Sequence, residues 1–457
     1  MAIIQPAELR ETIDNPAELL KSIQAAHELW AKGSDRRKKM DDYYRGEHDI
    51  LKRKMRDDLP NNRIVANYAK YITDMATGYL IGTPVTYSED DEGTDLEVIR
   101  EAYTLNDTGS LDADIAKDCS VFGVGYELDY QSEVGRVRIA VLDPQKTFLV
   151  VDDTIEARPL YGVYVVTKTD TEGEDVFEVT AYTESQSHTF SGKEIDALEF
   201  TSSTPHAFGR VPLIEYANNE EEVGDFEPVI GLIDAYNQTI SDRLNAKEQD
   251  IDALLALYGV EAPDPETAQR MREDRIVGLP IDAKAGWLTK QLSEADNETV
   301  RNALNEDIHK FSMIPDLTDQ NFAGNASGVA MEYKLMGFDQ MIAIKQRYFK
   351  AGLRRRLENF LATSKTRATE EIDTSGIEIH FTRNMPVNEV ELAQVVSALD
   401  GIISRLTQYS LLPMVKDPQK ELEQLRAEQE ESLEAQRKAF GSPEDGRSEP
   451  PVEDDEE

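Results

Sequence analysis

Residues Tyr43 to Tyr87 read YYRGEHDILKRKMRDDLPNNRIVANYAKYITDMATGYLIGTPVTY, and the second half of this stretch has a clear helical pattern. Between Asn67 and Leu80 the apolar side chains recur every three or four residues, at Tyr68, Tyr71, Ile72, Met75, Ala76 and Tyr79. Gly82 and Pro84 then end the pattern, as they commonly end a helix. We therefore predict an amphipathic helix whose tyrosines belong to a core rather than to a stacking platform for bases.

The composition limits what the chain can do. Its 457 residues suggest roughly two to four structural units. The formal charge is −40, from 89 acidic and 49 basic residues, and this disfavours DNA binding by neutralisation of phosphates. A mostly negative bore would still let a duplex slide through it, while solubility alone is an equally sufficient reason for the acidity.

Location and redox chemistry are also bounded by the sequence. No apolar run approaches the roughly eighteen residues of a membrane span, and the N-terminal residues lack the pattern of a signal peptide. We expect a soluble protein inside a cell. Cys119 is the only cysteine, which excludes an internal disulfide and a zinc site built from cysteines. Its expected role is that of a small buried hydrophobe.

The N-terminal half predicts helices followed by a sheet. Residues 1–40 have a helical stripe and end in the basic run Arg36 to Lys39, which could touch nucleic acid but is more often a solvated face. Between Val121 and Phe200, short β-rich runs separated by turn residues predict a mostly antiparallel sheet. Gly123 and Gly125 lack the βαβ context of a dinucleotide site and are expected to mark a turn or bulge.

The middle of the chain predicts an arm with a tip. A helical stripe runs from Pro228 to Tyr258, with an opposite polar face for solvent or a neighbouring subunit. Glycines and prolines interrupt residues 259–292, where two strands are expected near Arg275 to Leu279 and Trp287 to Gln291. A second helix follows in residues 293–315, so two helices bracket a small α/β insert.

The last third predicts one more long helix and several shorter elements. A polar, glycine-bearing segment at 316–330 precedes a helix at 331–365, with Ser327 as its cap and Gly337 as a candidate kink. The apolar stripe of this helix comprises Met331, Leu335, Phe338, Ile342, Tyr348, Phe349, Leu353, Leu357 and Leu361. The later half of that helix is the most basic region of the chain. A strand at Ile377 to Thr382 is expected to rejoin the earlier sheet. Helical stripes at Val390 to Leu411 and at Pro418 to Phe440 predict helices within residues 388–440, and the acidic residues 441–457 have a composition typical of disorder.

The stretch from Tyr43 to Tyr87 resembles a known family, the portal proteins of tailed double-stranded DNA bacteriophages, which are also called head-to-tail connectors. The resemblance is to the long-tailed siphophage type that infects Gram-positive hosts. The residues that carry the resemblance are Tyr44, Gly46, Asn62, Arg63, Ile64, Asn67, Tyr71, Asp74, Gly78, Tyr79, Gly82 and Pro84. The order of predicted elements along the rest of the chain is also similar to that of the family, so the resemblance covers most of the sequence.

The resemblance implies an α+β portal fold divided into named parts. Residues 1–227 would be the wing, 228–258 the first stem helix, 259–292 the clip, 293–315 the second stem helix and 316–330 the tunnel loop. Residues 331–365 would be a long kinked helix, 366–387 the return strand to the wing, 388–440 the crown and 441–457 a disordered acidic tail. The segment from Gly324 to Ala330 is similar to the family's junction between loop and helix.

The resemblance also implies a function. Such proteins form a ring, here expected to be a dodecamer, at one capsid vertex, through which DNA is packaged and ejected without sequence specificity. The expected partners are the terminase packaging motor, major capsid and scaffolding proteins, and a head-to-tail connector or adaptor protein. The expected location is the virion, and the host cytoplasm during assembly, with no membrane partner.

Candidate site residues follow from these parts. The tunnel-loop residues expected to face DNA are Gln320, Asn321 and Asn325, whose neutral groups can exchange from phosphate to phosphate. The basic candidates are Lys310, Lys334 and Lys345, for which solvated or intersubunit ion pairs are equally reasonable roles. The clip residues expected to bind partners are Arg270, Arg272, Arg275 and Trp287.

Two other functions compete with this interpretation. A metal-dependent nuclease would use some of the many carboxylates, but the clusters lie in loop-like sequence, and neither a phosphate-binding Gly-x-x-x-x-Gly-Lys-Ser/Thr loop nor a His-Glu-x-x-His pair occurs. We therefore predict no catalysis, no cofactor and no metal. The second competitor is a non-portal structural or adaptor protein of a virion, which the mass of the particle in solution would distinguish.

Overall fold

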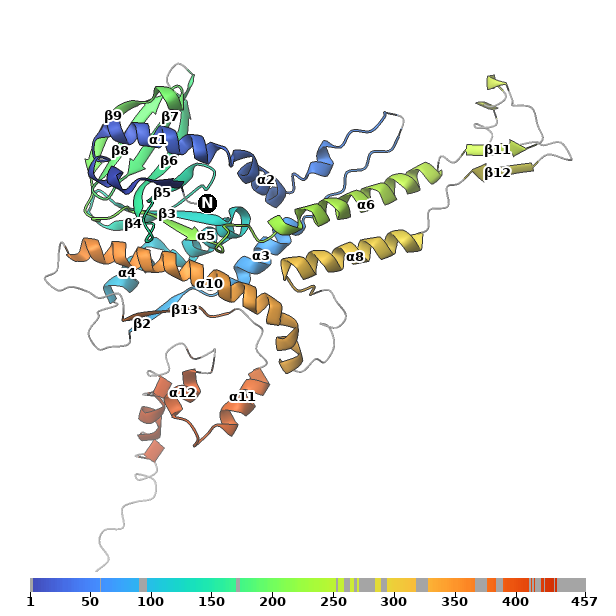
Figure 1. Ribbon diagram of the computed structural model, residues 1–457. Coiled ribbons are helices and arrows are strands. Elements are labelled where there is room, and N and C mark those ends of the chain that lie inside the picture. The colour runs from blue at the N-terminus through green and yellow to red at the C-terminus, as the bar shows by residue number, and fades with distance from the viewer. Residues whose placement is uncertain are drawn as a thin grey trace, which may run out of the picture. The chain divides into compact units, whose positions relative to one another are not determined.

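The computed structural model divides into two units, Met1–Asn384 and Met385–Glu457, which we describe separately (Figure 1). The structure describes residues 3–57, 59–89, 97–169, 173–251, 254–258, 264–266, 269–270, 284–288, 294–317, 328–365, 376–383, 389–410, 412, 415, 421–422, 424–430 and 432–433.

The chain begins with a strand and two helices. Strand β1 (Ile3–Gln5) runs parallel to β5, so the expectation of a wholly helical start was wrong for these residues. Helices α1 (Pro16–Ala31) and α2 (Ser34–Arg45) follow. The side chain of Asn15 accepts the Ala17 N–H at 3.0 Å and caps α1, whose first residue is proline.

The largest sheet has six strands in the order β1-β5-β6-β7-β8-β9, and all pairs except β1 with β5 are antiparallel. Its other strands are β5 (Thr147–Asp152), β6 (Pro159–Thr169), β7 (Asp175–Tyr182), β8 (Gln186–Gly192) and β9 (Glu199–Pro205). One face of the sheet buries Phe148, Tyr161 and Phe190 in the same cluster as Leu19 and Ile23 of α1. This cluster is the hydrophobic core of the N-terminal region.

A second sheet has three antiparallel strands in the order β10-β3-β4, so the single sheet predicted for residues 121–200 is in fact two. The strands are β3 (Val124–Gln131), β4 (Val137–Leu142) and β10 (Leu213–Ala217). Tyr126 and Leu128 of this sheet pack in one apolar cluster with Leu149 of the larger sheet. Alternation along β3 then sends Glu127 and Asp129 to the opposite face.

Helices cover that opposite face. The helix predicted in the opening stretch is α3 (Tyr68–Ile81), and Asn67 caps it by accepting the Lys70 N–H at 3.0 Å. Helices α4 (Glu97–Asn106) and α5 (Thr108–Phe122) follow, and α5 packs against both β3 and α3. Cys119 of α5 is buried as predicted and donates its thiol to the Tyr216 carbonyl at 3.3 Å.

The Gly-x-Gly pair has a steric explanation. Gly123 ends α5 with φ of 87°, and a Cβ there would lie 1.9 Å from the Glu222 carbonyl oxygen. At Gly125 a Cβ would lie 2.9 Å from the Ile115 carbonyl oxygen. The two glycines thus allow a tight turn from helix to strand and close packing of the two elements, in line with the expected turn.

An arm extends from this body (Figure 1). It comprises α6 (Ile230–Ile251), β11 (Leu254–Tyr258), β12 (Lys284–Leu288) and α8 (Glu294–Ser312). The predicted first stem helix is therefore too long, because its last residues form β11, antiparallel to β12. A short apolar run such as Leu254–Tyr258 fits a helix and a strand equally well. The expected strand near 275–279 lies outside the described residues, and the second expected strand starts earlier, at Lys284.

Helix α10 (Gly328–Lys365) is the longest in the structure's described part, and Figure 1 shows that it changes direction along its length. It buries Phe338, Ile342, Phe349, Leu353 and Leu357, five members of the predicted stripe. The predicted return strand is β13 (Ile377–His380), but its partner is β2 (Thr86–Glu89) rather than the sheet of residues 121–200.

The second unit contains α11 (Glu389–Ala398), α12 (Arg405–Ser410) and helical residues at 424–430. The sequence predicted one helix from Val390 to Leu411. A turn separates two helices instead, and Gly401 has φ of 78° there. The acidic tail lies outside the described residues. None of the described helices is both long and apolar enough to cross a membrane.

Candidate functional site

The two helices of the arm are joined by polar and aromatic contacts. Arg243 of α6 donates to Glu298 of α8 at 2.6 Å, and Arg301 donates to the other oxygen of Glu298 at 2.5 Å. At the base of the arm, the ring of Tyr68 of α3 meets those of Tyr236 of α6 and His309 of α8 edge to face, with centroids 5.1 and 5.9 Å apart. The predicted outward polar face of α6 is thus partly wrong, because Arg243 faces the other helix of the arm.

A ladder of hydrogen bonds fixes α6 to the segment from Tyr43 to Tyr87 with which the sequence analysis began. Three polar side chains of α6 each accept one backbone N–H from the extended segment that precedes α3. Asn245 accepts from Asn62 at 2.7 Å, Ser241 from Ile64 at 2.9 Å, and Asn237 from Ala66 at 2.8 Å. The accepting residues are buried. We call this set the amide ladder.

The spacing of the amide ladder follows from backbone geometry. Its acceptors recur every fourth residue along a helix, a rise of about 6.0 Å. Its donors recur every second residue along an extended strand, a rise of about 6.4 to 6.8 Å. The two repeats match closely enough for three successive bonds. The segment has no other strand to pair with among the described residues, so the helix side chains satisfy its backbone.

His48 extends the ladder into the body. The side-chain N–H of Asn237 donates to His48 Nδ1 at 2.9 Å, and His48 Nε2 donates to the Tyr43 carbonyl at 3.0 Å. This pattern assigns the neutral ring with its proton on Nε2. Burial lowers the pKa of His48, although the Tyr43 carbonyl opposes that shift. Tyr43 in turn donates to Asp234 of α6 at 2.7 Å.

The end of α8 is fixed where the chain leaves the arm. His309 Nδ1 donates to the Ile314 carbonyl at 3.0 Å, and Tyr71 donates to the Pro315 carbonyl at 3.3 Å. Met313 takes a positive φ of 58°, which a non-glycine residue seldom adopts. These contacts hold the residues that immediately precede the predicted tunnel loop.

The predicted DNA-facing residues have different outcomes. Gln320, Asn321 and Asn325 lie outside the described residues. Lys310 is exposed at the end of α8, and Lys334 is exposed near the start of α10. Lys345 must be removed from the set, because it is 4% exposed and forms an ion pair with Asp225. Its ammonium holds α10 to the loop before α6 and does not reach a surface.

A second buried charge anchors α10 three turns further on. Arg356 is fully buried, and its guanidinium donates to Glu127 of β3 at 2.8 and 2.5 Å and lies 2.7 Å from Asp112 of α5. Asn359 donates to Asp129 at 2.7 Å. Burial raises the pKa of both Asp112 and Asp129, and the neighbouring Glu127 raises that of Asp129 further. We call Arg356, Asn359 and these three acids the charged anchor.

Four residues were predicted to bind partners at the tip. Arg270 is exposed and pairs with Glu266 at 3.3 Å. Trp287 belongs to β12, where its backbone is paired with that of Leu255. Arg272 and Arg275 lie outside the described residues. The structure therefore leaves the predicted role of these residues untested.

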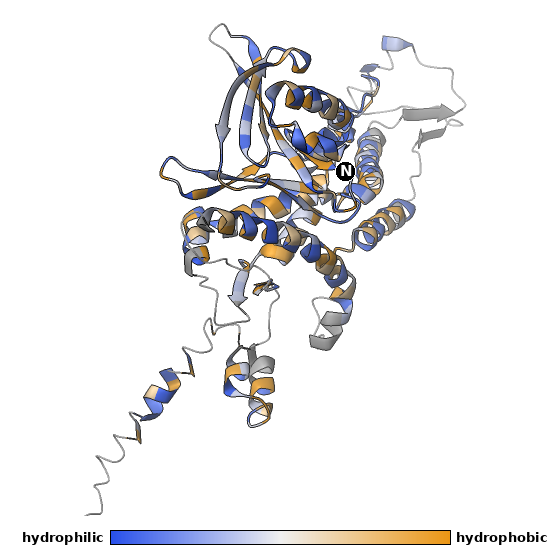
Figure 2. Ribbon diagram, turned by 60° about the vertical axis from the view of Figure 1, so that its left-hand side comes forward, coloured by the Kyte–Doolittle hydropathy of each residue, from blue (hydrophilic) through white to orange (hydrophobic). Residues whose placement is uncertain are grey.

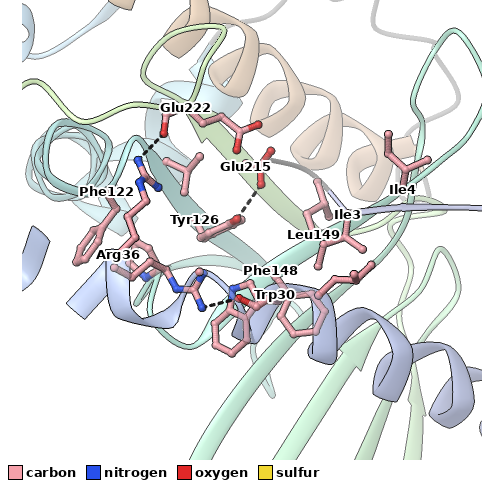
Figure 3. A pocket seen from close by; sticks show the side chains of 15 residues that line it. Ile3, Ile4, Trp30, Arg36, Phe122, Tyr126, Phe148, Leu149, Glu215 and Glu222 are labelled. Atoms are coloured by element: carbon pink, nitrogen blue, oxygen red, sulfur yellow. Dashed lines mark hydrogen bonds between the residues drawn. The ribbon is translucent and has the colours of Figure 1, made fainter. Parts of the chain in front are cut away.

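Two members of the basic run Arg36 to Lys39 have structural roles, whereas Lys38 is exposed, as expected of a solvated face. Arg36 donates to Glu227 at 2.6 Å and to the Glu222 carbonyl at 2.9 Å, and Arg37 lies over the Trp30 ring at 4.1 Å from its centroid. Arg36 and Arg37 also line a hollow of about 500 Å³, largely walled by apolar side chains (Figure 3).

Of the two acids that line the hollow, Glu215 is half-buried and hydrogen-bonded. Glu215 accepts the Tyr126 hydroxyl at 2.8 Å, and burial raises the pKa of its carboxyl group. The described residues contain no group of three or more His, Cys, Asp or Glu side chains arranged to hold a metal ion. The contacts described above therefore anchor the long helices α6 and α10 and join the two helices of the arm.

Comparison with known families identifies the class of protein to which this chain belongs. The family described as "Phage portal protein, SPP1 Gp6-like" matches residues 28–435, which is most of the chain. The protein therefore belongs to this family of phage portal proteins. The family is structural and not enzymatic, and its name places the protein in a virion.

The sequence of a named relative agrees with this assignment. The portal protein of Bacillus phage SPP1 is 25% identical over 443 residues, covering 92% of this chain and 86% of the relative. Two solved structures of gene transfer agent particles, an empty-particle neck and a native virion, are 14% and 13% identical with TM-scores of 0.45 and 0.46. Each match covers 75% of this chain. It covers 87% of the chain from the empty-particle neck and 88% of the chain from the native virion.

Sequence reasoning missed both the amide ladder and the charged anchor. The ladder had a visible signal, since Asn237, Ser241 and Asn245 interrupt the apolar stripe of α6 at intervals of four. The charged anchor had almost none. Glu127 and Asp129 alternate with apolar residues in a short strand pattern, and their partners Arg356 and Asn359 are more than two hundred residues away in the sequence.

Proposed function

We propose that copies of this chain form a closed ring, a dodecamer in the virion, whose central channel passes double-stranded DNA during packaging and ejection. The observation that carries the proposal is the family match across residues 28–435. The anchored helices support it as well. A channel that passes a long polymer under load benefits from helices held by buried contacts rather than by exposed ones, which are weak.

In this proposal the arm is the stem and clip, and the segment between α8 and α10 faces the channel. Gln320, Asn321 and Asn325 offer neutral groups to the DNA backbone, and exposed Lys310 and Lys334 add replaceable cationic contacts. Contacts of this kind suit sliding, because neither supplies a base-specific interaction. The net charge of −40 also opposes tight, static binding of DNA.

The proposed partners act at the two ends of the channel. The terminase motor and later the head-to-tail connector would dock on the tip of the arm, where Arg270, Arg272, Arg275 and Trp287 lie in the sequence. Major capsid and scaffolding proteins would surround the ring during assembly in the host cytoplasm. Substitution of Arg270 and Arg272 by glutamate should weaken terminase binding in a pull-down while the ring remains intact.

The ring itself is tested by mass and by imaging. Purified protein should sediment as an oligomer of about twelve chains, and electron micrographs should show a ring with a central hole. A compact monomer or dimer, in the presence as well as the absence of capsid partners, would contradict the proposal and favour a non-portal structural role.

The channel-facing segment is tested by deletion. Removal of residues 320–325 should leave ring assembly unchanged and reduce DNA packaging or retention. Packaging is measured as nuclease-protected DNA per particle. Normal packaging by this variant would refute the role of the segment without affecting the proposal of a ring.

A further inference from the structure

The outward face of the later half of α10 is basic and unpaired. Arg347, Lys350 and Arg354 follow one another at intervals of three and four residues, so they share one side of the helix. Arg347 and Arg354 are exposed and Lys350 is half-buried. Within the described part of the chain, none of these three residues takes part in an ion pair. We call them the basic face.

This face continues toward the start of α10 with apolar side chains. Ile344 and Tyr333 lie on the same side of the helix, 48% and 74% exposed. Both colours of the hydropathy scale occur along individual helices in Figure 2, as expected of helices with one packed side and one outward side. An outward side that is partly apolar and partly basic is better suited to a protein contact than to solvent alone.

A matching acidic face lies on α2 and α5 and on the residues that follow α2 and β4. Five carboxylates gather there with three basic side chains. The acids are Asp41, Glu47, Asp114, Asp118 and Asp143, and the bases are Arg45, Lys117 and Lys146. Burial raises the pKa of Asp118 to about 7, and Asp143, Asp114 and Asp41 raise it further against the opposing Lys117. We call these five acids the acidic face.

The two faces point in opposite directions. Arg356 of α10 and Asp112 of α5 are 2.7 Å apart, so this contact marks the line that joins the two helices. Arg354 is two residues from Arg356, and Asp114 is two residues from Asp112. A separation of two residues turns a side chain about 200° around a helix. Arg354 therefore points away from α5, while Asp114 points away from α10.

We propose that the basic face of one copy docks on the acidic face of the next copy around the ring. This inference rests on the proposed ring and names its electrostatic contact. A closed ring needs two different complementary patches on each subunit, placed so that contacts repeat head to tail. Opposed basic and acidic faces on one body fulfil that requirement, and they favour the correct neighbour in a chain whose overall charge is repulsive.

The decisive variants reverse one face at a time. Arg347→Glu with Arg354→Glu places acid against acid, and Asp114→Lys with Glu47→Lys places base against base. Either double variant should raise the concentration needed for half-maximal ring assembly by about tenfold or more. Assembly is followed by analytical ultracentrifugation, and the far-ultraviolet circular dichroism of each variant should match that of the original chain.

A control separates this contact from total charge. Arg136, just before β4, and Lys193, just after β8, are exposed basic residues, with Lys193 67% exposed in a pair with Glu174. Their reversal to glutamate changes the formal charge from −40 to −44, as does the Arg347/Arg354 double variant, since each reversal adds two negative charges. The control should assemble at the original concentration.

Mixing the two assembly-deficient variants gives the sharpest test. In an alternating ring each reversed basic face meets a reversed acidic face, and each unchanged face meets an unchanged one. An equimolar mixture should therefore recover rings with an even number of subunits, which native mass spectrometry would show to contain both variants in equal amounts. Failure of the mixture while both variants stay folded would overturn the proposal.

The remaining outcomes are also informative. If the original chain forms rings and Arg347→Glu with Arg354→Glu assembles equally well, the proposed contact is wrong while the ring stands. If that variant forms normal rings but retains less DNA, the basic face binds DNA instead of a neighbouring copy, and the proposal is likewise overturned. A failure of the original chain to form rings at all would instead count against the proposed function.

Discussion

Helix α6 of the arm and helix α10 of the body are held in opposite chemical ways. Helix α6 is held by the amide ladder, in which three neutral side chains each satisfy one backbone N–H. Helix α10 is held by the charged anchor, in which one buried guanidinium faces Asp112 and Glu127 with Asp129 close by. Neutral hydrogen bonds set register at modest cost, whereas a buried ion pair becomes very unfavourable once one partner is lost.

The difference suggests different roles for the two helices. The amide ladder matches two repeats, so it fixes how far along the extended segment α6 lies. The charged anchor has no repeat, and it fixes a single point, where α5, β3 and α10 meet. The base of the arm is thus positioned along a line, and the later half of α10 is pinned.

Removal of the positive charge of Arg356 from the charged anchor should lower the free energy of unfolding more than any other change considered below. Arg356→Met leaves Asp112 and Glu127 buried without their cation, and we expect the free energy of unfolding to fall by about 3 to 5 kcal/mol. Arg136→Met, an exposed arginine outside both proposed faces, should change it by less than about 0.5 kcal/mol. Urea denaturation followed by circular dichroism measures both values. Equal stability of the two variants would mean that the anchor contributes no more than a surface residue.

A break in the amide ladder should cost less. Asn245→Ala removes the acceptor for the Asn62 backbone N–H, and leaving such a donor unsatisfied costs about 1 to 3 kcal/mol. Gln238→Ala, on the exposed side of α6, is the matched control and should be close to neutral. A loss from Asn245→Ala as large as that from Arg356→Met would erase the contrast between the two kinds of contact.

Much of the helical framework could be predicted because it depends on local pattern. The stripe and cap of α3, the stripe of α10 and the two-helix arm all follow from side-chain spacing within one segment. The family assignment came from one stretch, and the amide ladder now gives a physical reason for part of it. The backbone of Asn62 and Ile64 pairs with helix side chains, so the segment needs a particular extended conformation.

The errors have one physical origin, which is that partners distant in sequence decide local structure. Leu254–Tyr258 became a strand because β12 lies beside it, and Ile377–His380 joined β2 instead of the larger sheet. Lys345 looked available for DNA because the sequence did not reveal Asp225 as its buried partner. In each case composition allowed two outcomes and a tertiary contact selected one.

The dependence of stability on pH should also distinguish the two helices, because α6 contacts the titratable His48 through Asn237. Burial lowers the pKa of His48 in the folded protein, so below its unfolded value of about 6.5 the unfolded chain binds a proton that the native state resists. The native state therefore loses stability as the pH falls from 7 to 5, by up to about 1.4 kcal/mol per pH unit. Urea midpoints measured across this range test the slope.

The same histidine allows the slope to be reversed. Asn237→Asp keeps an acceptor for the Ala66 N–H and places a carboxylate oxygen beside His48 Nδ1, where the charged ring can donate to it. We expect the folded pKa of His48 to rise, so this contact stabilises the native state below the folded pKa and is lost as the pH rises through it. A slope unchanged in this variant would show that other groups dominate the acid response.

The smallest effect on stability is expected for the contact between Arg243 and Glu298, because neither side chain is buried. Arg243 and Glu298 join the helices of the arm but are 29% and 39% exposed, so water and salt screen their attraction. Double-mutant cycles with Arg243→Gln and Glu298→Gln should give a coupling energy of about 0.2 to 1 kcal/mol, which vanishes in about 1 M salt. Hydrogen exchange of the α8 amides measures it locally. A coupling energy above about 2 kcal/mol that persists in salt would place this pair with the charged anchor, and the contrast between a pinned body and a more weakly joined arm would have to be abandoned.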